Sequence, residues 1–364
     1  MKLRPLAMIS VCCAMLALAL QGWPGQSRPI DGVPAAVDAR TSAVATDRIP
    51  PQFRRPGVYT YLTIPEWYLV WSSDEYADFI AAHPPSGFPY LAHLGQFWSG
   101  YRTIYDSTKD RYPFDGGYHM MIVVIGVSTS VEYGMKAGYE NIVGRLAESV
   151  TLHGPTAEDS LAAMTARRYV EFIRVEPWYR FDFLTPLKKI WTEAGVWGSD
   201  PLRKWERKYF LTSEYAVKAA YGWFLDQAAG VAYGEEKPVT VVLLDRVPEH
   251  SSDSIPELHL LSRGADGSAV CTVPRYQAFT YYARALATAG ANFLNIAGND
   301  GTILVSAIVP AGFDDSGLRL LMRQPITTRP GQQRIVMMVP VCELGNVIRR
   351  WDHPPLWLEH VYDY

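Results

Sequence analysis

The sequence predicts an α+β protein, in which a mainly helical N-terminal domain precedes a smaller α+β domain with an antiparallel or mixed sheet. Apolar residues recur every three or four positions through most of 58–236, which is the period of amphipathic helices. After Glu235, short β-branched runs alternate with turn residues, as in strands. The expected parts are a signal segment at 1–20, a flexible tether at 21–57, the helical domain at 58–236 and the α+β domain at 237–364.

The N-terminus has the features of an export signal. Lys2 and Arg4 precede an uncharged apolar stretch at 6–20. Ala17 and Ala19 form a small-x-small cleavage site, which favours a signal peptide that is removed. The body of the protein is therefore expected outside the cytoplasm, either periplasmic or secreted.

The same segment could instead remain as a membrane anchor. Extended to Trp23, it covers about 27 Å as a helix, close to the roughly 30 Å hydrocarbon core of a bilayer. The tether 21–57 is rich in Pro, Ala and Ser and lacks a helical or strand period, as expected of a linker behind an anchor. Residues 6–23 would then hold the protein at the inner membrane.

Four or five principal helices are expected in the helical domain, with capping residues or proline at their starts. They cover 72–83, 89–110, 118–150, 156–176 and 201–234. The central helix, 118–150, has an apolar run that is too short to span a membrane. In the last helix, the residues on or near one face are Trp205, Tyr209, Tyr221, Phe224 and Leu225.

The C-terminal domain is expected to contain short strands and one principal helix. A β-branched run predicts a strand at 239–245, and a Gly-rich turn predicts a hairpin within 257–273. Further elements are a helix at 275–290, strands at 293–296, 302–310 and 334–341, and a short helix ending near Trp351. The aromatic tail after it is expected to pack against the body of the protein.

Charge and motif content exclude several classes of protein. Lys and Arg total 34 against 37 Asp and Glu, without a basic run, which argues against nucleic-acid binding. The chain lacks GxxxxGK[ST], GxGxxG, HExxH, CxxC and GxSxG, the signatures of nucleotide loops, zinc proteases, thioredoxin-like sites and nucleophile elbows. No cofactor and no metal are therefore expected.

The central helix carries the main candidate catalytic residues. Asp115 and His119 are four residues apart and would share one helix face. Glu132 and Glu140 lie on a similar side to each other, but Glu132 is far round the helix from His119, so these two could form one site only if the helix bends, for example near Gly126. An acid/base pair could form between His119 and either Glu132 or Asp182. The alternative for Glu132 is a helix-packing network in which an Arg, Tyr or His side chain donates to its carboxylate.

A second candidate site lies in the aromatic segment 176–183. Arg180 lies between Glu176 and Asp182 in the sequence, beside Trp178. Such an arginine could bind an anionic or sugar ligand through paired hydrogen bonds and ring contacts. The alternative is a charge pair that fixes a turn after Pro177.

Only Cys271 and Cys342 lie outside the signal segment. An oxidising compartment would allow them to form a disulfide. The alternative is two buried free thiols in strand-like surroundings.

Two functions follow as expectations. The first is an exported, membrane-proximal protein that binds an apolar or amphipathic ligand, such as a lipid or glycan, or an envelope partner, because the chain has 11 Trp and 22 Tyr. The second is a metal-independent, hydrolase-like acid/base enzyme that uses His119 with Glu132 or Asp182.

Overall fold

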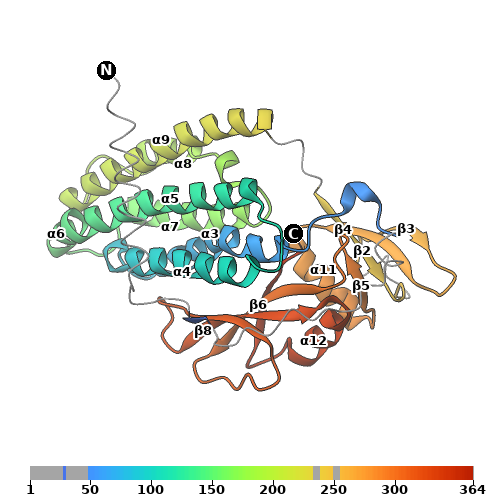
Figure 1. The fold of residues 1–364 in the computed structure, drawn as a ribbon. Coiled ribbons are helices and arrows are strands. Elements are labelled where there is room, and N and C mark those ends of the chain that lie inside the picture. Colours follow the sequence, from blue (N-terminus) through green and yellow to red (C-terminus); the bar gives the residue numbers. More distant parts are fainter. Residues whose placement is uncertain (1–27, 30–47, 233–237, 249–254, 364) are drawn as a thin grey trace. The chain divides into compact units, whose positions relative to one another are not determined.

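The computed structural model describes residues 28–29, 48–232, 238–248 and 255–363 (Figure 1). The expected signal at 1–20, and all of the tether 21–57 except 28–29 and 48–57, lie outside the described residues. Of the helices in the described ranges, none combines the length and apolar character that a membrane span requires.

The predicted fold class is confirmed, because helices fill the first part of the described chain and antiparallel sheets follow. The helices before the sheets are α3 (Tyr59–Ile80), α4 (Tyr90–Thr108), α5 (Gly116–Tyr139), α6 (Arg145–Ser149), α7 (Ala157–Ile173), α8 (Leu184–Thr192) and α9 (Pro201–Ala232). The short turns among them are η1 (Pro51–Phe53), η2 (Pro85–Gly87), η3 (Glu140–Gly144) and η4 (Trp178–Arg180).

Three helical expectations differ from the structure. Helix α3 begins well before the expected 72–83 segment and contains Pro65, because its first turns bury Tyr61 and other large side chains that offset the lost hydrogen bond. Helix α8 was not expected. The central helix is interrupted by the π-helical turn η3, not near Gly126.

Contacts divide the described residues into two compact units. Unit 1 contains Trp67–Leu94 and the described residues of Gly126–Glu236, and unit 2 contains the rest. The division passes through α3, α4 and α5, so unit 2 includes helical segments as well as both sheets. A junction near 232–238 that separates two independently folding domains stays a prediction.

Unit 2 is built on two sheets in which all strands pair antiparallel. Their strand orders are β1-β7-β8-β6-β9 and β3-β4-β2-β5. The strands are β1 (Arg28–Pro29), β2 (Val239–Leu244), β3 (His259–Arg263), β4 (Ala269–Pro274), β5 (Phe293–Ile296), β6 (Thr302–Pro310), β7 (Leu320–Pro325), β8 (Gln332–Pro340) and β9 (Trp357–Val361). The helical elements that lie between these strands in the sequence are α11 (Gln277–Thr288), η5 (Val341–Glu343) and α12 (Leu344–Trp351).

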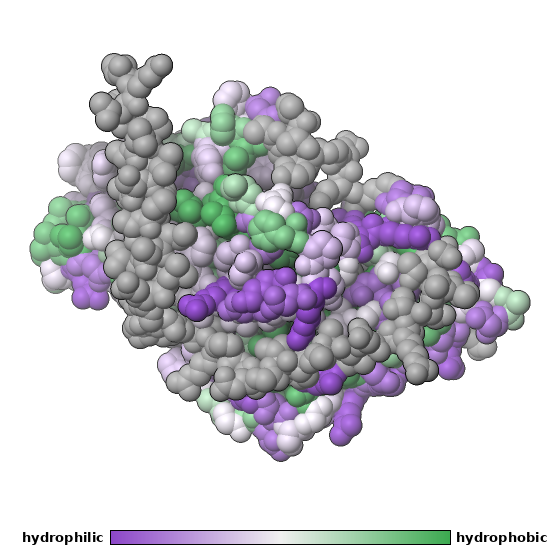
Figure 2. Space-filling view, in the orientation of Figure 1, coloured by the Kyte–Doolittle hydropathy of each residue, from purple (hydrophilic) through white to green (hydrophobic). Residues whose placement is uncertain are grey.

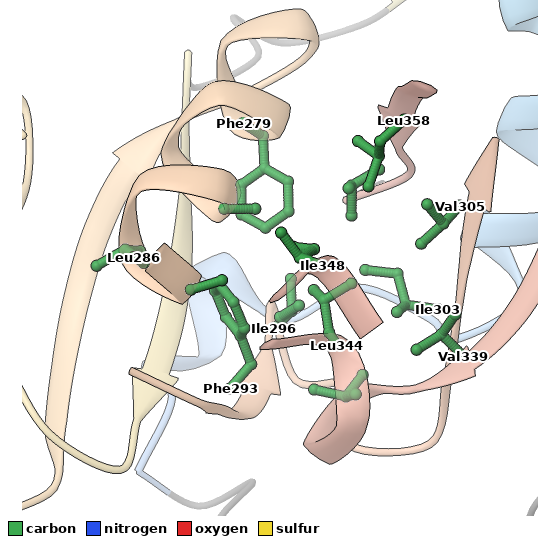
Figure 3. Close-up of a cluster of buried hydrophobic side chains, with 14 of the residues drawn as sticks. Phe279, Leu286, Phe293, Ile296, Ile303, Val305, Val339, Leu344, Ile348 and Leu358 are labelled. Carbon is green, nitrogen blue, oxygen red and sulfur yellow. The ribbon is translucent and has the colours of Figure 1, made fainter. Parts of the chain in front are cut away.

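The main core of unit 2 lies between these sheets and the helices α11 and α12. Phe279 of α11 points toward Ile348 of α12, and Leu286 of α11 and Leu344 of α12 belong to the same cluster (Figure 3). Buried side chains of β2 and of β4 to β9 belong to the same cluster. Strand β9 is the aromatic tail that was expected to pack on the body, and β7 was not expected because its sequence, LLMRQP, has no β-branched residue.

Unit 1 packs α7, α8 and α9 against one another, with the charged face of α9 turned inward. The buried charged residues of α9 are Arg203, Lys204, Glu206, Arg207 and Lys208. Its outward residues include Leu202, Trp205, Tyr209, Val217, Trp223 and Phe224, exposed by 58, 40, 68, 67, 68 and 60%. The aromatic face expected from the sequence is therefore exposed to solvent instead of packed in a core.

The last described carboxylate, Asp363, is buried in unit 2. Burial raises the pKa of Asp363 to about 7, although Arg275 and Arg55 act in the opposite direction. The unfolded chain releases this proton near pH 3.8. Between these values the folded protein binds more protons, so the free energy of unfolding falls as pH rises from about 4 to about 7.

We expect Asp363→Asn to remove this loss, which could reach about 4 kcal/mol. Melting temperatures of both proteins at about pH 5 and about pH 8 test it, because groups shared by both cancel in the comparison. The wild type should lose more stability than the variant between the two pH values. Equal losses would show that Asp363 is ionised in the folded protein throughout this range.

Candidate functional site

The predicted pair Asp115 and His119 lies at the start of α5, in unit 2, but the two side chains have different partners. The Asp115 carboxylate accepts hydrogen bonds from the Tyr118 backbone N–H and the Tyr59 hydroxyl, both at 2.9 Å. The bond from the Tyr118 backbone is the main cause that lowers the pKa of Asp115, partly opposed by burial. Asp115 therefore acts as an ionised cap of α5.

His119 is buried among aromatic rings. Its ring stacks on Phe114, with centroids 4.5 Å apart, and its Nδ1 lies 3.0 Å from the Tyr101 hydroxyl. Burial lowers the pKa of His119, with Asp115 opposing the shift. Burial also raises the pKa of Tyr101, so a neutral imidazole faces a protonated phenol at neutral pH. The two rings therefore share a hydrogen bond between neutral groups.

A small pocket opens beside His119 and is also lined by Asp115, Tyr105, Lys109 and Phe114. Its volume is about 10 Å³. A single water molecule needs roughly 10–15 Å³ measured in this way. The pocket therefore has room for about one water, and a lipid chain or a sugar ring does not fit.

The expected catalytic partners of His119 are engaged elsewhere. Glu132 lies 13 residues further along α5, or about 20 Å along the helix axis. Asp182 caps α8, where its carboxylate accepts from the Leu184 N–H at 3.0 Å and the Thr185 hydroxyl at 2.6 Å. The bond from Thr185 is the main cause that lowers the pKa of Asp182. Neither carboxylate bonds to His119.

Glu132 belongs to a four-residue ionic cluster in unit 1. Its carboxylate lies 3.0 Å from Lys136 Nζ and 2.9 Å from Lys218 Nζ, and Glu214 contacts both lysines at 2.7 and 3.0 Å. Burial alone would raise the pKa of Glu132, but Lys218 and Lys136 outweigh it and lower the pKa to about 2. The expectation of an Arg, Tyr or His donor was wrong, because both partners are lysines.

Glu140 is fully buried and bonds to Arg207 of α9. Both Arg207 Nη atoms lie 3.0 Å from Glu140 Oε1, and Nη2 also lies 3.2 Å from Oε2. A Cβ atom on Gly144 would lie 2.3 Å from Glu140 Oε2, so the turn η3 requires glycine at that position. The donors of Arg207 therefore occupy the carboxylate that was considered for ligand binding.

The aromatic segment forms the exposed turn η4. Arg180 lies 3.5 Å from Glu176 and 3.3 Å from Asp226 of α9, so its second carboxylate is not Asp182 as expected. Trp178 packs against Tyr221, with ring centroids 5.5 Å apart. Ion pairs as exposed as these contribute about 0–1 kcal/mol each. The geometry fits the alternative in which the charges fix a turn.

The two cysteines remain free thiols. Cys271 is buried in β4, whereas Cys342 is exposed in η5. The disulfide considered from the sequence is not formed, and Cys342 is not the buried thiol of the alternative interpretation.

The sequence interpretation missed a buried polar cluster that joins α3, α4 and α5. His93 Nδ1 lies 3.0 Å from Ser72 Oγ, His93 Nε2 lies 3.6 Å from Glu75, and Ser72 contacts the Tyr133 hydroxyl at 2.7 Å. These are the residue types of a Ser–His–Glu triad, but all of these side chains are buried. The three-residue spacing of Ser72 and Glu75 on one helix was the signal that could have revealed the cluster.

The described residues contain no group of three or more His, Cys, Asp or Glu side chains that could hold a metal ion. Comparisons with protein-family models, curated proteins and solved structures found no significant match.

We expect Glu132→Gln to lower the free energy of unfolding by about 1–3 kcal/mol, because two lysines lose a counter-ion. The loss should be smaller than for a fully buried pair, since the Glu132 side chain is 36% exposed. Thermal or urea unfolding measures it, with Glu176→Gln as the exposed control. The difference from wild type should shrink as pH falls from about 4.5 toward 2, where the wild-type carboxylate also becomes protonated. Wild-type stability of Glu132→Gln at neutral pH would contradict the ionic role.

Proposed function

We propose that this is an exported, membrane-proximal protein that binds an apolar or amphipathic partner through the outward face of α9. The supporting observation is the exposure of this face, which we call the α9 stripe: Leu202, Trp205, Tyr209, Val217, Trp223 and Phe224. The stripe extends over about 33 Å of helix. Soluble monomers rarely expose continuous apolar surface of this kind outside interaction sites.

Rotation of α9 cannot hide the stripe. The opposite face carries Arg203, Arg207 and Lys208, all buried. Lys208 donates to the carbonyl oxygens of Ile190 and Ala194, both at 2.6 Å. Exposure of the aromatic side chains is therefore tied to the satisfaction of buried charges.

The pocket at His119 is too small to be the binding site of such a partner. A space for about one water cannot enclose a lipid or a glycan. Trp and Tyr side chains, in contrast, suit a boundary between apolar and wet surroundings. The stripe therefore fits a lipid or an amphipathic envelope partner.

The rival function, a metal-independent acid/base enzyme, now depends on His119 alone. Tyr101 lies within hydrogen-bond distance of its ring, and the pocket can hold a water for proton exchange. Glu132 and Asp182 form no bond to His119, and Asp115, which lines the same pocket, accepts hydrogen bonds from Tyr118 and Tyr59 as the cap of α5. A catalytic carboxylate beside His119 therefore has no support. Binding is therefore the stronger proposal.

We expect a reporter that is active only outside the cytoplasm to be active when fused after Tyr364. The apolar segment 6–20 behind Lys2 and Arg4 motivates this expectation. Mass spectrometry of the N-terminus then distinguishes cleavage after Ala19 from retention. Activity of a cytoplasm-only reporter at the same position would contradict export.

We expect the protein to bind nonionic detergent micelles through the α9 stripe. Tyr209→Glu and Val217→Glu should each weaken binding about tenfold or more, because burial of such a side chain contributes about 1.5–3 kcal/mol. Tyr281→Glu is the matched control, since Tyr281 is exposed on α11 of unit 2. Equal binding of all three variants, measured by equilibrium gel filtration, would remove the support for the stripe.

A further inference from the structure

A second group of exposed apolar side chains lies at one end of unit 1, where α6 and the start of α9 are in contact. We call it the apolar tip; its residues are Ile142, Val143, Leu146, Val150, Leu152, Trp197 and Leu202, exposed by 72, 40, 65, 48, 84, 80 and 58%. Figure 2 shows hydrophobic surface over the end that carries α6. Leu202 belongs to both the tip and the stripe.

The tip is held in place by polar contacts. Asp200 accepts hydrogen bonds from the backbone N–H groups of Leu152 at 2.8 Å and His153 at 3.0 Å, which joins the loop after α6 to the loop before α9. Glu148 of α6 lies 3.6 Å from Arg203 and accepts a hydrogen bond from Ser86 at 2.5 Å. The apolar side chains are thus presented from a fixed backbone, which lowers the entropy lost on binding.

The exposed charge of the tip is a cation, Arg145. Arg145 is exposed between Val143 and Leu146 and forms no ion pair with any of the described residues. The Asp200 and Glu148 carboxylates, in contrast, contact partners within the unit. Apolar side chains around an unpaired arginine complement anionic lipid headgroups above an acyl layer.

The size of the tip favours a bilayer over a protein partner. Its seven side chains fall well short of the roughly 20–30 residues that each side of a stable protein interface supplies. Shallow insertion of a few aliphatic side chains with one tryptophan at the headgroup level is enough for reversible membrane binding. The expected N-terminal membrane segment would keep the protein close to a bilayer surface.

We infer that the apolar tip binds the surface of an anionic phospholipid bilayer, with Leu146, Leu152 and Trp197 inserted and Arg145 at the headgroups. This inference rests on the proposed function and names the bilayer as the amphipathic partner. It adds a contact made by unit 1 itself to the one expected from residues 6–23.

The test measures binding of the full chain to phosphatidylcholine vesicles with and without phosphatidylglycerol. Brominated lipids quench tryptophans that reach the bilayer, so quenching reports the tip even where an N-terminal anchor holds every variant on the vesicles. We expect part of the quenching to disappear in Trp197→Phe. Leu146→Glu and Leu152→Glu should each weaken tip binding at least tenfold, and Leu261→Glu on β3 is the exposed control.

A separate variant tests the contribution of the Arg145 charge to vesicle binding. Arg145→Glu should weaken binding to vesicles with phosphatidylglycerol more than to phosphatidylcholine alone, and the difference should shrink at high salt. Circular dichroism and melting temperature show whether each variant is folded. A tip variant that does not fold is replaced by the corresponding serine substitution.

The inference is overturned if Trp197→Phe and the glutamate variants are quenched like the wild type. It is also overturned if they change self-association in the absence of lipid and leave vesicle binding unchanged, which would indicate a second copy of the chain as the partner. Loss of vesicle binding in Tyr209→Glu but not in Leu146→Glu would overturn the tip and leave the stripe in place. Failure of the micelle experiment as well would overturn both proposals.

Discussion

The paired hydrogen bonds between Arg207 and Glu140 fix the orientation on which the helical unit depends. Both side chains are almost completely buried, and the carboxylate accepts from both terminal nitrogens of the guanidinium. The turn η3, with glycine at 144, brings Glu140 to this position. Because residues four apart share a helix face, fixing Arg207 also directs Arg203 and Leu211 inward and sends Tyr209 outward.

The inward charges explain why an aromatic helix face can stay in water. Moving a single ion from water into a protein costs several kcal/mol, and loss of one partner in a buried pair costs roughly 3–5 kcal/mol. Along α9, Lys204 and Lys208 both pair with the fully buried Glu158, at 3.1 and 3.0 Å. Burying the stripe would require breaking several such pairs at once, and each pair costs more than the roughly 1.5–3 kcal/mol that one buried apolar side chain could contribute.

The sequence was sufficient for the fold class and the larger elements, because periodicity and turn residues report local structure. It could not show which face of α9 lies inside, since a 3.6-residue period places Trp205 and Tyr209 together without giving their direction. The usual expectation is that the apolar face of a helix is buried. In α9 the charged face is buried instead, because Arg207 pairs with the buried Glu140, which lies 67 positions away in the sequence. Prediction of the candidate site met the same limit. Asp115 and His119 both line the pocket at the start of α5, but their hydrogen-bond partners Tyr59 and Tyr101 come from other helices. Local spacing in the sequence does not reveal such partners.

Apolar surface that cannot be turned inward promotes association of protein molecules in water. Such a surface has to be covered by a partner, or the protein has to stay at low concentration. A site inside a pocket would not relieve this, and the space beside His119 holds about one water. A membrane surface can cover both the stripe and the tip without a matching shape, since lipid chains adapt to aliphatic and aromatic side chains alike. The same arrangement makes the stability of the helical unit depend on the ion pairs of α9, because each buried charge needs its partner. The proposed contact with a membrane surface would thus relate the charged interior of the helical unit to its aromatic exterior, which an active site in the small pocket would leave unrelated.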